Sequence, residues 1–397
     1  MPIKIIFMGT PSFAARILDE LIDKSLNFSS QASAISGSGP KEEVVLETRS
    51  NATNALKDIN RAKKFDILCV FTNEDKAFGR KGKLKQSEVK ALAREKIPQT
   101  PIFTPKSLKN DEIIKQIQGL KPDFIVVAAY GKILPKALLE ITPCINLHAS
   151  LLPKYRGASP IQQAILNCDE ISGVCAMLMN EKLDAGAVLA SEKLNIKDKR
   201  ASEVFEQMSE LAATLCVRVL SEFNLLKAEP QDESKATYCV KIKKEDGLVN
   251  LKDAREIYRK FLAFYPWPGV FLENGLKFMD IEVVEDVGFE DINLSENLEN
   301  ATTCHSECGE KSTDKEQTVN LNIDSSLATQ TQNDEVGVNS KVNSKAGKIL
   351  AVKNSYFLLA CEKGVLKVKA LQEVGKKIVN ARAYINGKRL KVGDSLC

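Results

Sequence analysis

The sequence of 397 residues is poor in two side chains that often build binding sites, since it holds only 2 histidines and 1 tryptophan. A metal centre with more than two histidine ligands is therefore excluded. No stretch approaches the ~18 consecutive apolar residues of a membrane span. The amino end, MPIKIIFMGT, has a short apolar run without a cleavage pattern, which is typical of a first strand and not of a signal peptide. We expect a cytoplasmic protein that does not bind a membrane.

Two ligand motifs are incomplete, and disulfides are not expected. The turn at Gly9 follows a predicted strand but lacks the G-x-G-x-x-G spacing, so a nicotinamide cofactor is not expected. Cys304, His305 and Cys308 have the residue types of zinc ligands at cramped spacing in an acidic segment; no metal is expected there. The 10 cysteines are scattered through segments such as DILCVF and ATLCVRVL, which favours buried, reduced thiols.

Two segments lack the composition of a packed core. Residues 29–64 contain no aromatic residue and begin SSQASAISGSGP. Residues 286–345 contain 12 acidic residues against 4 lysines, a local balance of −8, within a chain of net charge +4. Both are expected to be disordered surface insertions. The remainder of the chain, at about +12, is distinctly basic.

Apolar strands alternate with helical patterns over residues 1–226. Strands are expected at 4–10, 66–73 and 123–131 among others, and the longest helical pattern covers 201–223. Continuous apolar strands separated by helices predict an α/β fold with an open, doubly wound, mostly parallel, Rossmann-like sheet. Such folds bind ligands beyond the carboxyl ends of their strands.

The pattern changes after residue 226. Residues 227–242 are expected to be a linker, and 243–397 a smaller second domain. Short strand-like runs such as FLENGLKF, GKILAV and SYFLLACEKGVLKVKAL contain Asn-Gly and Lys-Gly turns. These runs predict a small OB-like β-barrel. The only tryptophan, Trp267 in YPWPG, is expected to pack in a core.

Three polar residues suggest chemistry at a carbonyl group. Asn146 and His148 are two residues apart at the end of a predicted strand, so their side chains point to the same side. Asp184 lies among apolar neighbours in a turn, LDAG. An amide and an imidazolium would stabilise an oxyanion, while histidine or aspartate would move the proton. From these residues alone a structural or merely exposed histidine is the more common interpretation, and Asp184 could equally be an ordinary turn residue.

The stretch INLHASLLPKYRGASP, followed by NEKLDAGAV, resembles the folate-dependent formyltransferases, whose pattern is N-x-H-x-S-L-L-P-x-x-[RK]-G-x-x-P with a later L-D-x-G. FMGTPSFAARILDELI, ATYCVKIKKEDGLVNL and FYPWPGVFLENG resemble the branch that acts on methionyl-tRNA. The likeness covers nearly everything except the two insertions. It implies a formyltransferase fold and transfer of the formyl group of 10-formyltetrahydrofolate to the methionine amino group of initiator methionyl-tRNA. It also implies catalysis by Asn146, His148 and Asp184, and folate contacts from Ser150, Leu151, Leu152 and Pro153.

Basic residues fit a tRNA partner. The segment KAFGRKGKLK places five cations around two glycines: Lys76, Arg80, Lys81, Lys83 and Lys85. It reads as a mobile basic loop, and the resemblance implies that Arg80 contacts the acceptor end of tRNA. Lys367 and Lys369 alternate along VLKVKAL and would face phosphates from one side of a strand. Solvated surface lysines are the alternative interpretation at both places.

Two other functions stay open. A related formyltransferase could act on a sugar or ribonucleotide amine, although the basic segments would then lack a purpose. A non-catalytic RNA-binding protein would not need Asn146, His148 and Asp184 together. A monomer is expected.

Overall fold

The structure, a computed structural model, describes residues 1–34, 64–78, 82–284 and 346–396. The expected insertions fall largely outside the described residues, as do Arg80, Lys81, Cys304, His305 and Cys308. The first helix, α1 (Ser12–Ala34), continues past Ser29, where the first insertion was expected to begin.

The chain divides into two compact units. The first comprises Met1–Gly247 and Arg259–Gly269, and the second comprises Leu248–Tyr258 and Val270–Cys397. The boundary crosses helix α8 (Ala254–Phe264), whose first residues belong to the second unit.

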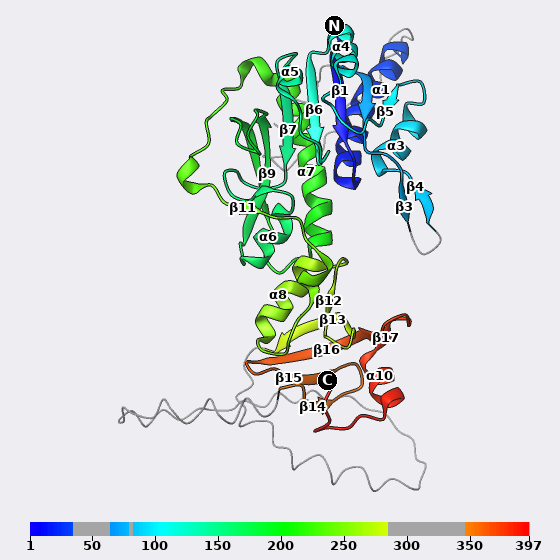
Figure 1. Cartoon of the computed structure of the whole chain (residues 1–397), viewed down its shortest axis with the longest axis vertical. Coiled ribbons are helices and arrows are strands. Elements are labelled where there is room, and N and C mark those ends of the chain that lie inside the picture. Colours follow the sequence, from blue (N-terminus) through cyan, green and yellow to red (C-terminus); the bar gives the residue numbers. More distant parts are fainter. Residues whose placement is uncertain (35–63, 79–81, 285–345, 397) are drawn as a thin grey trace, which may run out of the picture. The chain divides into compact units, whose positions relative to one another are not determined.

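A seven-stranded sheet forms the centre of the first unit, in the order β10-β9-β7-β6-β1-β2-β5. Its strands are β1 (Ile3–Gly9), β2 (Phe65–Phe71), β5 (Ile102–Phe103), β6 (Phe124–Ala128), β7 (Cys144–His148), β9 (Ile171–Leu178) and β10 (Val188–Asn195). The first five are parallel, and β9 runs antiparallel to both β7 and β10. β1, β6 and β7 lie side by side (Figure 1). The expected mostly parallel α/β fold is confirmed.

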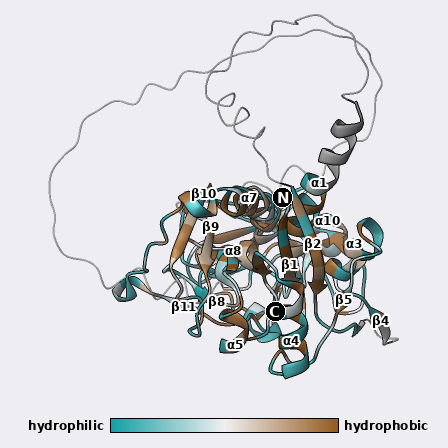
Figure 2. Cartoon of the chain, turned by 90° about the horizontal axis from the view of Figure 1, so that it is seen from above, coloured by the Kyte–Doolittle hydropathy of each residue, from teal (hydrophilic) through white to brown (hydrophobic). Residues whose placement is uncertain are grey.

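The central strands are apolar on both faces because helices cover both. On β1, Ile6 and Met8 pack in one buried cluster with Ile117 and Leu138, which lie on α4 (Asp111–Leu120) and α5 (Lys136–Leu139). α7 (Ala201–Glu222) packs against α1, β9 and β10. α3 (Glu88–Lys96) packs beside α1, and its N-terminus is capped by Ser87, which accepts from the Lys90 amide. β1 and β2 are coloured mostly hydrophobic (Figure 2), apart from Lys4 and Asp66 near their starts.

The sheet order reverses at β1, since β2 and β5 extend to one side of it while β6 and β7 extend to the other. Ligands in such sheets bind beyond the carboxyl ends of the strands near this reversal. β10 runs in the same direction as β7, so α7, which follows it, also begins at this edge of the sheet. α6 (Pro160–Leu166) follows the loop after β7.

The segment 227–242, expected as a linker, is bound along the first unit, and we call it the strap. Glu229 exchanges two backbone hydrogen bonds with Val188. β11 (Tyr238–Cys239) pairs in parallel with β8 (Arg156–Gly157), and the Arg156 amide donates to the Thr237 carbonyl over 2.8 Å. The expectation missed this because backbone pairing to a distant segment leaves no periodic pattern in a polar sequence.

The second unit is built on an antiparallel sheet of order β12-β13-β16-β15-β14, with β17 on β16. Its elements are β12 (Val270–Phe271), β13 (Lys277–Val284), β14 (Ile349–Val352), β15 (Phe357–Ala360), β16 (Val365–Gln372), β17 (Val379–Asn380) and α10 (Ala381–Lys388). An antiparallel second domain is confirmed, while closure into an OB-like barrel stays a prediction. Among the described residues, no helix has the length and apolar character that crossing a membrane requires.

Candidate active site

Asn146 and His148 end strand β7 and are both buried, at 8% and 6% exposure. Their separation by two residues places both side chains on one face of the strand. The antiparallel neighbour β9 pairs His148 with Cys175 and Asn146 with Met177. The predicted pair therefore sits at the carboxyl edge of the central sheet.

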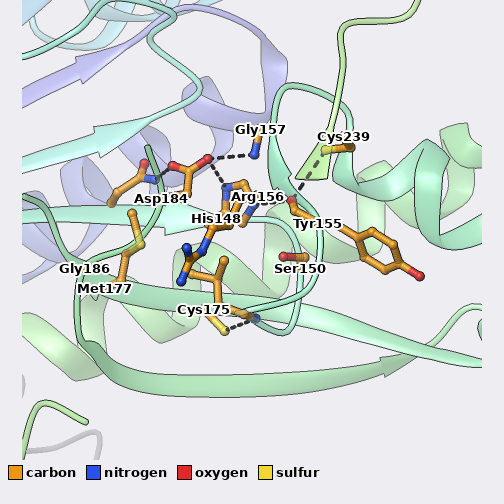
Figure 3. A network of polar contacts seen from close by, with 12 residues as sticks. His148, Ser150, Tyr155, Arg156, Gly157, Cys175, Met177, Asp184, Gly186 and Cys239 are labelled. Atoms are coloured by element: carbon orange, nitrogen blue, oxygen red, sulfur yellow. Dashed lines mark hydrogen bonds and ion pairs between the residues drawn. The ribbon is translucent and has the colours of Figure 1, made fainter. Parts of the chain in front are cut away.

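Asp184, in the turn between β9 and β10, brings its carboxylate to both residues. Its Oδ2 lies 3.7 Å from His148 Nδ1, and the Asn146 amide nitrogen lies 3.5 Å from its Oδ1. The Gly157 amide donates to Oδ2 over 2.8 Å, and Figure 3 shows the carboxylate between Gly157 and His148. The structure thus gathers the three residues that the sequence predicted as catalytic.

The second ring nitrogen of His148 is held by the backbone. Nε2 lies 2.9 Å from the carbonyl oxygen of Tyr155, so Nε2 carries a proton and donates it to that carbonyl. The Nδ1–Asp184 distance exceeds the ~3.2 Å of a normal hydrogen bond. Nδ1 is therefore the nitrogen left to gain or give a proton beside Asp184.

The loop expected to contact folate is folded tightly against the sheet and the strap. Ser150 is fully buried and its hydroxyl donates to the Lys154 carbonyl over 2.6 Å. The Leu152 amide donates to the sulfur of Cys175, and burial raises the pKa of that thiol to about 11. The Pro153 carbonyl accepts from the Thr237 amide. Leu151, Leu152 and Pro153 are partly exposed, so contact with a ligand is open to them, whereas the Ser150 side chain is enclosed.

A buried polar network that the sequence analysis missed lies beside this site. Arg156 is 1% exposed and donates to Gln231 and Glu233 from the strap, 75 and 77 residues away. The Glu233 carboxylate raises the pKa of Arg156, and the guanidinium in turn lowers the pKa of Glu233. The signal that could have drawn attention to Arg156 is its place in the quoted motif, INLHASLLPKYRGASP. Its burial is unusual for an arginine and is seen only in the structure.

A cavity of about 610 Å³ opens where α1, α6 and α7 begin, and all its lining residues belong to the first unit. Four aromatic side chains line it, with Arg16, Gln162 and Glu206 among the polar ones: Phe13, Phe205, Tyr265 and Trp267. Trp267 is 58% exposed, so the expectation that it packs in a core was wrong. Trp267 lies between Pro266 and Pro268 in the turn that follows α8, and it lines the cavity.

The basic segment 76–85 begins and ends as two short antiparallel strands, β3 (Lys76–Phe78) and β4 (Lys83–Lys85), with Lys76 opposite Lys85. The ammonium of Lys85 lies 2.9 Å from the carboxylate of Glu88. Lys76 is exposed. Arg80 and Lys81 lie outside the described residues, so their predicted contact with tRNA stays a prediction.

In the second unit, Lys367 and Lys369 project from β16 as the alternation predicted, and both reach one carboxylate. Glu282, on the neighbouring strand β13, lies 3.1 Å from the Lys367 ammonium and also pairs with Lys369. The two ammoniums lower the pKa of Glu282, Lys369 most. The two lysines thus present less positive charge than the sequence suggested.

The arrangement at β7 can stabilise an oxyanion and move a proton. An amide N–H and an imidazole converge with a carboxylate that is itself held by a backbone amide, in a site largely shielded from water. Among the described residues, no group of three or more histidine, cysteine or acidic side chains is arranged to hold a metal ion.

Comparison with known proteins identifies the family. A model of the formyl transferase family matches residues 41–220, and a model of the formyl transferase C-terminal domain matches 241–310 and 313–389. The chain is 49% identical to a methionyl-tRNA formyltransferase of Campylobacter jejuni subsp. doylei over 357 residues, 90% of this chain and 100% of that protein. A methionyl-tRNA formyltransferase of Campylobacter lari is 46% identical over 392 residues, 99% of each chain.

A solved structure shares the fold. An N-formyltransferase from Helicobacter canadensis, in complex with folinic acid and dTDP-3-aminofucose, has a TM-score of 0.51 at 12% identity, over 93% of this chain and 99% of that one. Identity this low shows likeness of fold alone. With nearly half of its residues shared over almost the whole of the Campylobacter proteins, the chain belongs to the methionyl-tRNA formyltransferases, a family of folate-dependent enzymes.

Proposed function

We propose that the protein transfers the formyl group of 10-formyltetrahydrofolate to the α-amino group of methionine on initiator methionyl-tRNA, for translation initiation in the cytoplasm. The observation that carries this proposal is the convergence of Asn146, His148 and Asp184 at the end of β7. Membership of the family, at 46% to 49% identity, supports the choice of substrates.

The reaction is a direct attack by the amine. The neutral nitrogen of the methionyl group adds to the formyl carbon, and the carbonyl oxygen becomes an oxyanion. The bond from that carbon to the folate nitrogen then breaks, while the proton lost by the attacking amine goes to the departing nitrogen. An α-amino group titrates near pH ~8, so the attacking nitrogen needs little activation. Stabilising the tetrahedral oxyanion is the larger task.

Asn146 and His148 would meet that oxyanion. The Asn146 amide nitrogen donates toward Asp184 Oδ1 over a long 3.5 Å, so its N–H can turn to a stronger acceptor. His148 Nδ1 holds the proton that stabilises the oxyanion, since Nε2 is bound to the Tyr155 carbonyl. Both groups are preorganised by β7 and are shielded from water.

Asp184 would support the protonated imidazole and relay the proton. Its carboxylate faces Nδ1 at 3.7 Å, so it could receive a proton from that nitrogen directly or through one water. The Gly157 amide keeps the carboxylate in place and satisfies one of its lone pairs. Neither a covalent intermediate nor a nucleophilic side chain is needed for this route.

The two substrates would approach from neighbouring parts of the same edge of the sheet. The partly exposed Leu151, Leu152 and Pro153 would contact the folate, while the enclosed Ser150 supports the loop's shape. We assign the 610 Å³ cavity to the methionyl end of the tRNA because aromatic side chains line it and one of them, Phe13, lies in the first turn of α1, the helix that follows β1. Lys76, Arg80, Lys81, Lys83 and Lys85 would then contact the acceptor arm, and Lys367 and Lys369 phosphates elsewhere on the tRNA.

The proposal is tested by incubating the protein with 10-formyltetrahydrofolate and charged initiator tRNA, with free methionine and an amino sugar nucleotide as parallel acceptors. We expect formylation of the tRNA-borne methionine only. Formylation of the sugar amine would instead identify a small-molecule formyltransferase, and RNA retention without turnover would identify a binding protein.

A further inference from the structure

Arg156 is fully used as a hydrogen-bond donor inside the protein. A guanidinium has five N–H groups, and five bonds leave it: Nε and Nη2 donate to Gln231 Oε1, Nη1 and Nη2 donate to Glu233, and Nη1 donates to the Tyr238 hydroxyl. All three partners belong to the strap. A buried guanidinium with every donor satisfied is held in one orientation, and it can orient the groups that accept its hydrogen bonds.

Arg156 orients the side-chain amide of Gln231. Its Oε1 accepts from Arg156 Nε over 3.1 Å and from Nη2 over 2.8 Å. The opposite orientation would turn the NH2 group toward a cation, so the amide nitrogen must point the other way. There Nε2 donates to the carbonyl of Asp184 over 2.9 Å and to the carbonyl of Gly186 over 2.7 Å.

The turn held by Gln231 is the one that carries the Asp184 carboxylate. Asp184 has a left-handed backbone, with φ of 47°, which costs a non-glycine residue free energy and needs support. At Gly186 an added Cβ would lie 1.6 Å from the Leu178 carbonyl oxygen, so the turn is pressed against the end of β9. Gln231 bonds the carbonyls on both sides of Ala185 and so fixes the direction in which the carboxylate leaves the backbone.

We propose that Gln231 is a positioning residue for formyl transfer: through its two hydrogen bonds to the Asp184–Gly186 turn, it aims the Asp184 carboxylate at His148 and Asn146. Gln231 touches neither substrate in this account and acts only through Asp184. The inference rests on the proposed function, because it assumes that Asp184 takes part in the reaction.

The strap does not need Gln231 to stay in place. Glu229 is bonded to Val188 through the backbone, and Thr237 and Cys239 are bonded to the loop of residues 153–158 in the same way. A change confined to the Gln231 amide should therefore release the turn while leaving the strap attached.

Two variants of Gln231 separate the loss of its hydrogen bonds to the Asp184–Gly186 turn from the loss of its hydrogen bonds to Arg156. Gln231→Glu keeps the shape and the acceptor for Arg156 but replaces the NH2 donor by an oxygen that repels both carbonyls. Gln231→Leu removes donor and acceptor together and leaves two Arg156 donors without a partner, so we expect it to lower the melting temperature as well. Gln207→Leu, on the exposed face of α7, is the matched control for loss of a glutamine amide.

Misplacement of a catalytic group by ~1 Å can cost ~100-fold in rate. For Gln231→Glu we expect kcat to fall at least ~10-fold, with KM for methionyl-tRNA unchanged and the melting temperature close to that of the unmodified protein. Gln207→Leu should leave kcat unchanged. Full turnover in Gln231→Glu would overturn the proposal.

The deciding measurement combines each change with Asp184→Asn. If Gln231 acts through the carboxylate, Gln231→Glu will cost much less in the Asp184→Asn protein than in the unmodified one. An equal loss of kcat in both backgrounds would overturn the positioning role and leave a general structural one. Full turnover by Asp184→Asn alone would instead refute the proposed part of Asp184, and with it this inference.

Discussion

His148 has a different partner on each ring nitrogen, and this asymmetry defines its use. The Tyr155 carbonyl holds Nε2 at 2.9 Å, while Nδ1 faces Asp184 at 3.7 Å. The backbone therefore decides which nitrogen carries the fixed proton, and in the proposed mechanism the nitrogen that faces the carboxylate takes part in the reaction.

At the residue scale, we expect His148→Ala and Asp184→Asn each to lower kcat at least ~100-fold, because one removes the proton carrier and the other its electrostatic support. Steady-state formylation of methionyl-tRNA measures this. Asp198→Asn is the matched control: Asp198 has a similar backbone, with φ of 56°, but is exposed. Near-normal turnover in either active-site variant would remove that residue from the mechanism.

Trp267 is exposed and lines the cavity assigned to the methionyl end. Trp267→Ala should raise KM for methionyl-tRNA several-fold with a smaller change in kcat, since it removes apolar contact that is present in both ground and transition states. Trp267→Phe should recover most of the loss. A KM that is unchanged in Trp267→Ala would place the methionyl group elsewhere.

Short strands β8 and β11 attach the strap to the loop that follows β7, and Gly157 is the residue that permits their approach. Its φ is 120°, and an added Cβ would lie 2.2 Å from the Cys239 carbonyl oxygen. Gly157→Ala should therefore lower stability by more than ~2 kcal/mol, as backbone strain and steric conflict coincide. Thermal unfolding monitors the change.

A glycine without such constraints provides the comparison. Nothing lies within 4 Å of a Cβ added at Gly119, in helix α4. Gly119→Ala should be neutral or stabilise by up to ~1 kcal/mol, because alanine has the higher helix propensity. Equal melting temperatures for the Gly157 and Gly119 variants would show that β8 and β11 can move apart at little cost in stability.

Strands β13 and β16 place one carboxylate between two lysines, which sets how much charge this face offers to phosphates. Glu282→Gln should strengthen tRNA binding and steepen its salt dependence, because Lys367 and Lys369 lose their shared partner. Glu373→Gln is the matched control, since Glu373 pairs in the same way with Lys376 and Lys388. Identical salt slopes for Glu282→Gln and the unmodified protein would argue against phosphate contacts from Lys367 and Lys369.

At the scale of the whole molecule, charge is distributed unevenly along the sequence. Residues 286–345, which lie outside the described part of the chain, carry 12 acidic residues and 4 lysines, whereas the rest carries about +12. Replacing 286–345 by a short linker should leave kcat unchanged and should not weaken tRNA binding, because a block of negative charge is removed and neither the residues at the end of β7 nor those lining the cavity belong to this segment. A large loss of kcat would assign these residues a direct part in activity.

Periodicity and spacing were enough to predict much of the fold and part of the site. Buried parallel strands are apolar along their whole length, so DILCVF and DFIVVAAYG were recognisable without a structure. The Asn146–His148 pair was also accessible, because alternate residues of a strand share a face whatever surrounds them. The approach of Asp184 followed only from the resemblance to a family, since nothing local to LDAG indicates where its turn lies.

Contacts between distant segments decided the rest. The five hydrogen bonds of Arg156, the two donated by Gln231 and the sharing of Glu282 by two lysines join residues at least 45 positions apart. A buried or paired charge looks the same in a sequence as a solvated one. The sequence by itself determined which segments become strands and helices and which polar groups stand at the end of β7, because those properties depend on neighbouring residues. Only the tertiary structure decided which partner each polar group has, because that depends on which parts of the chain meet once the core has packed.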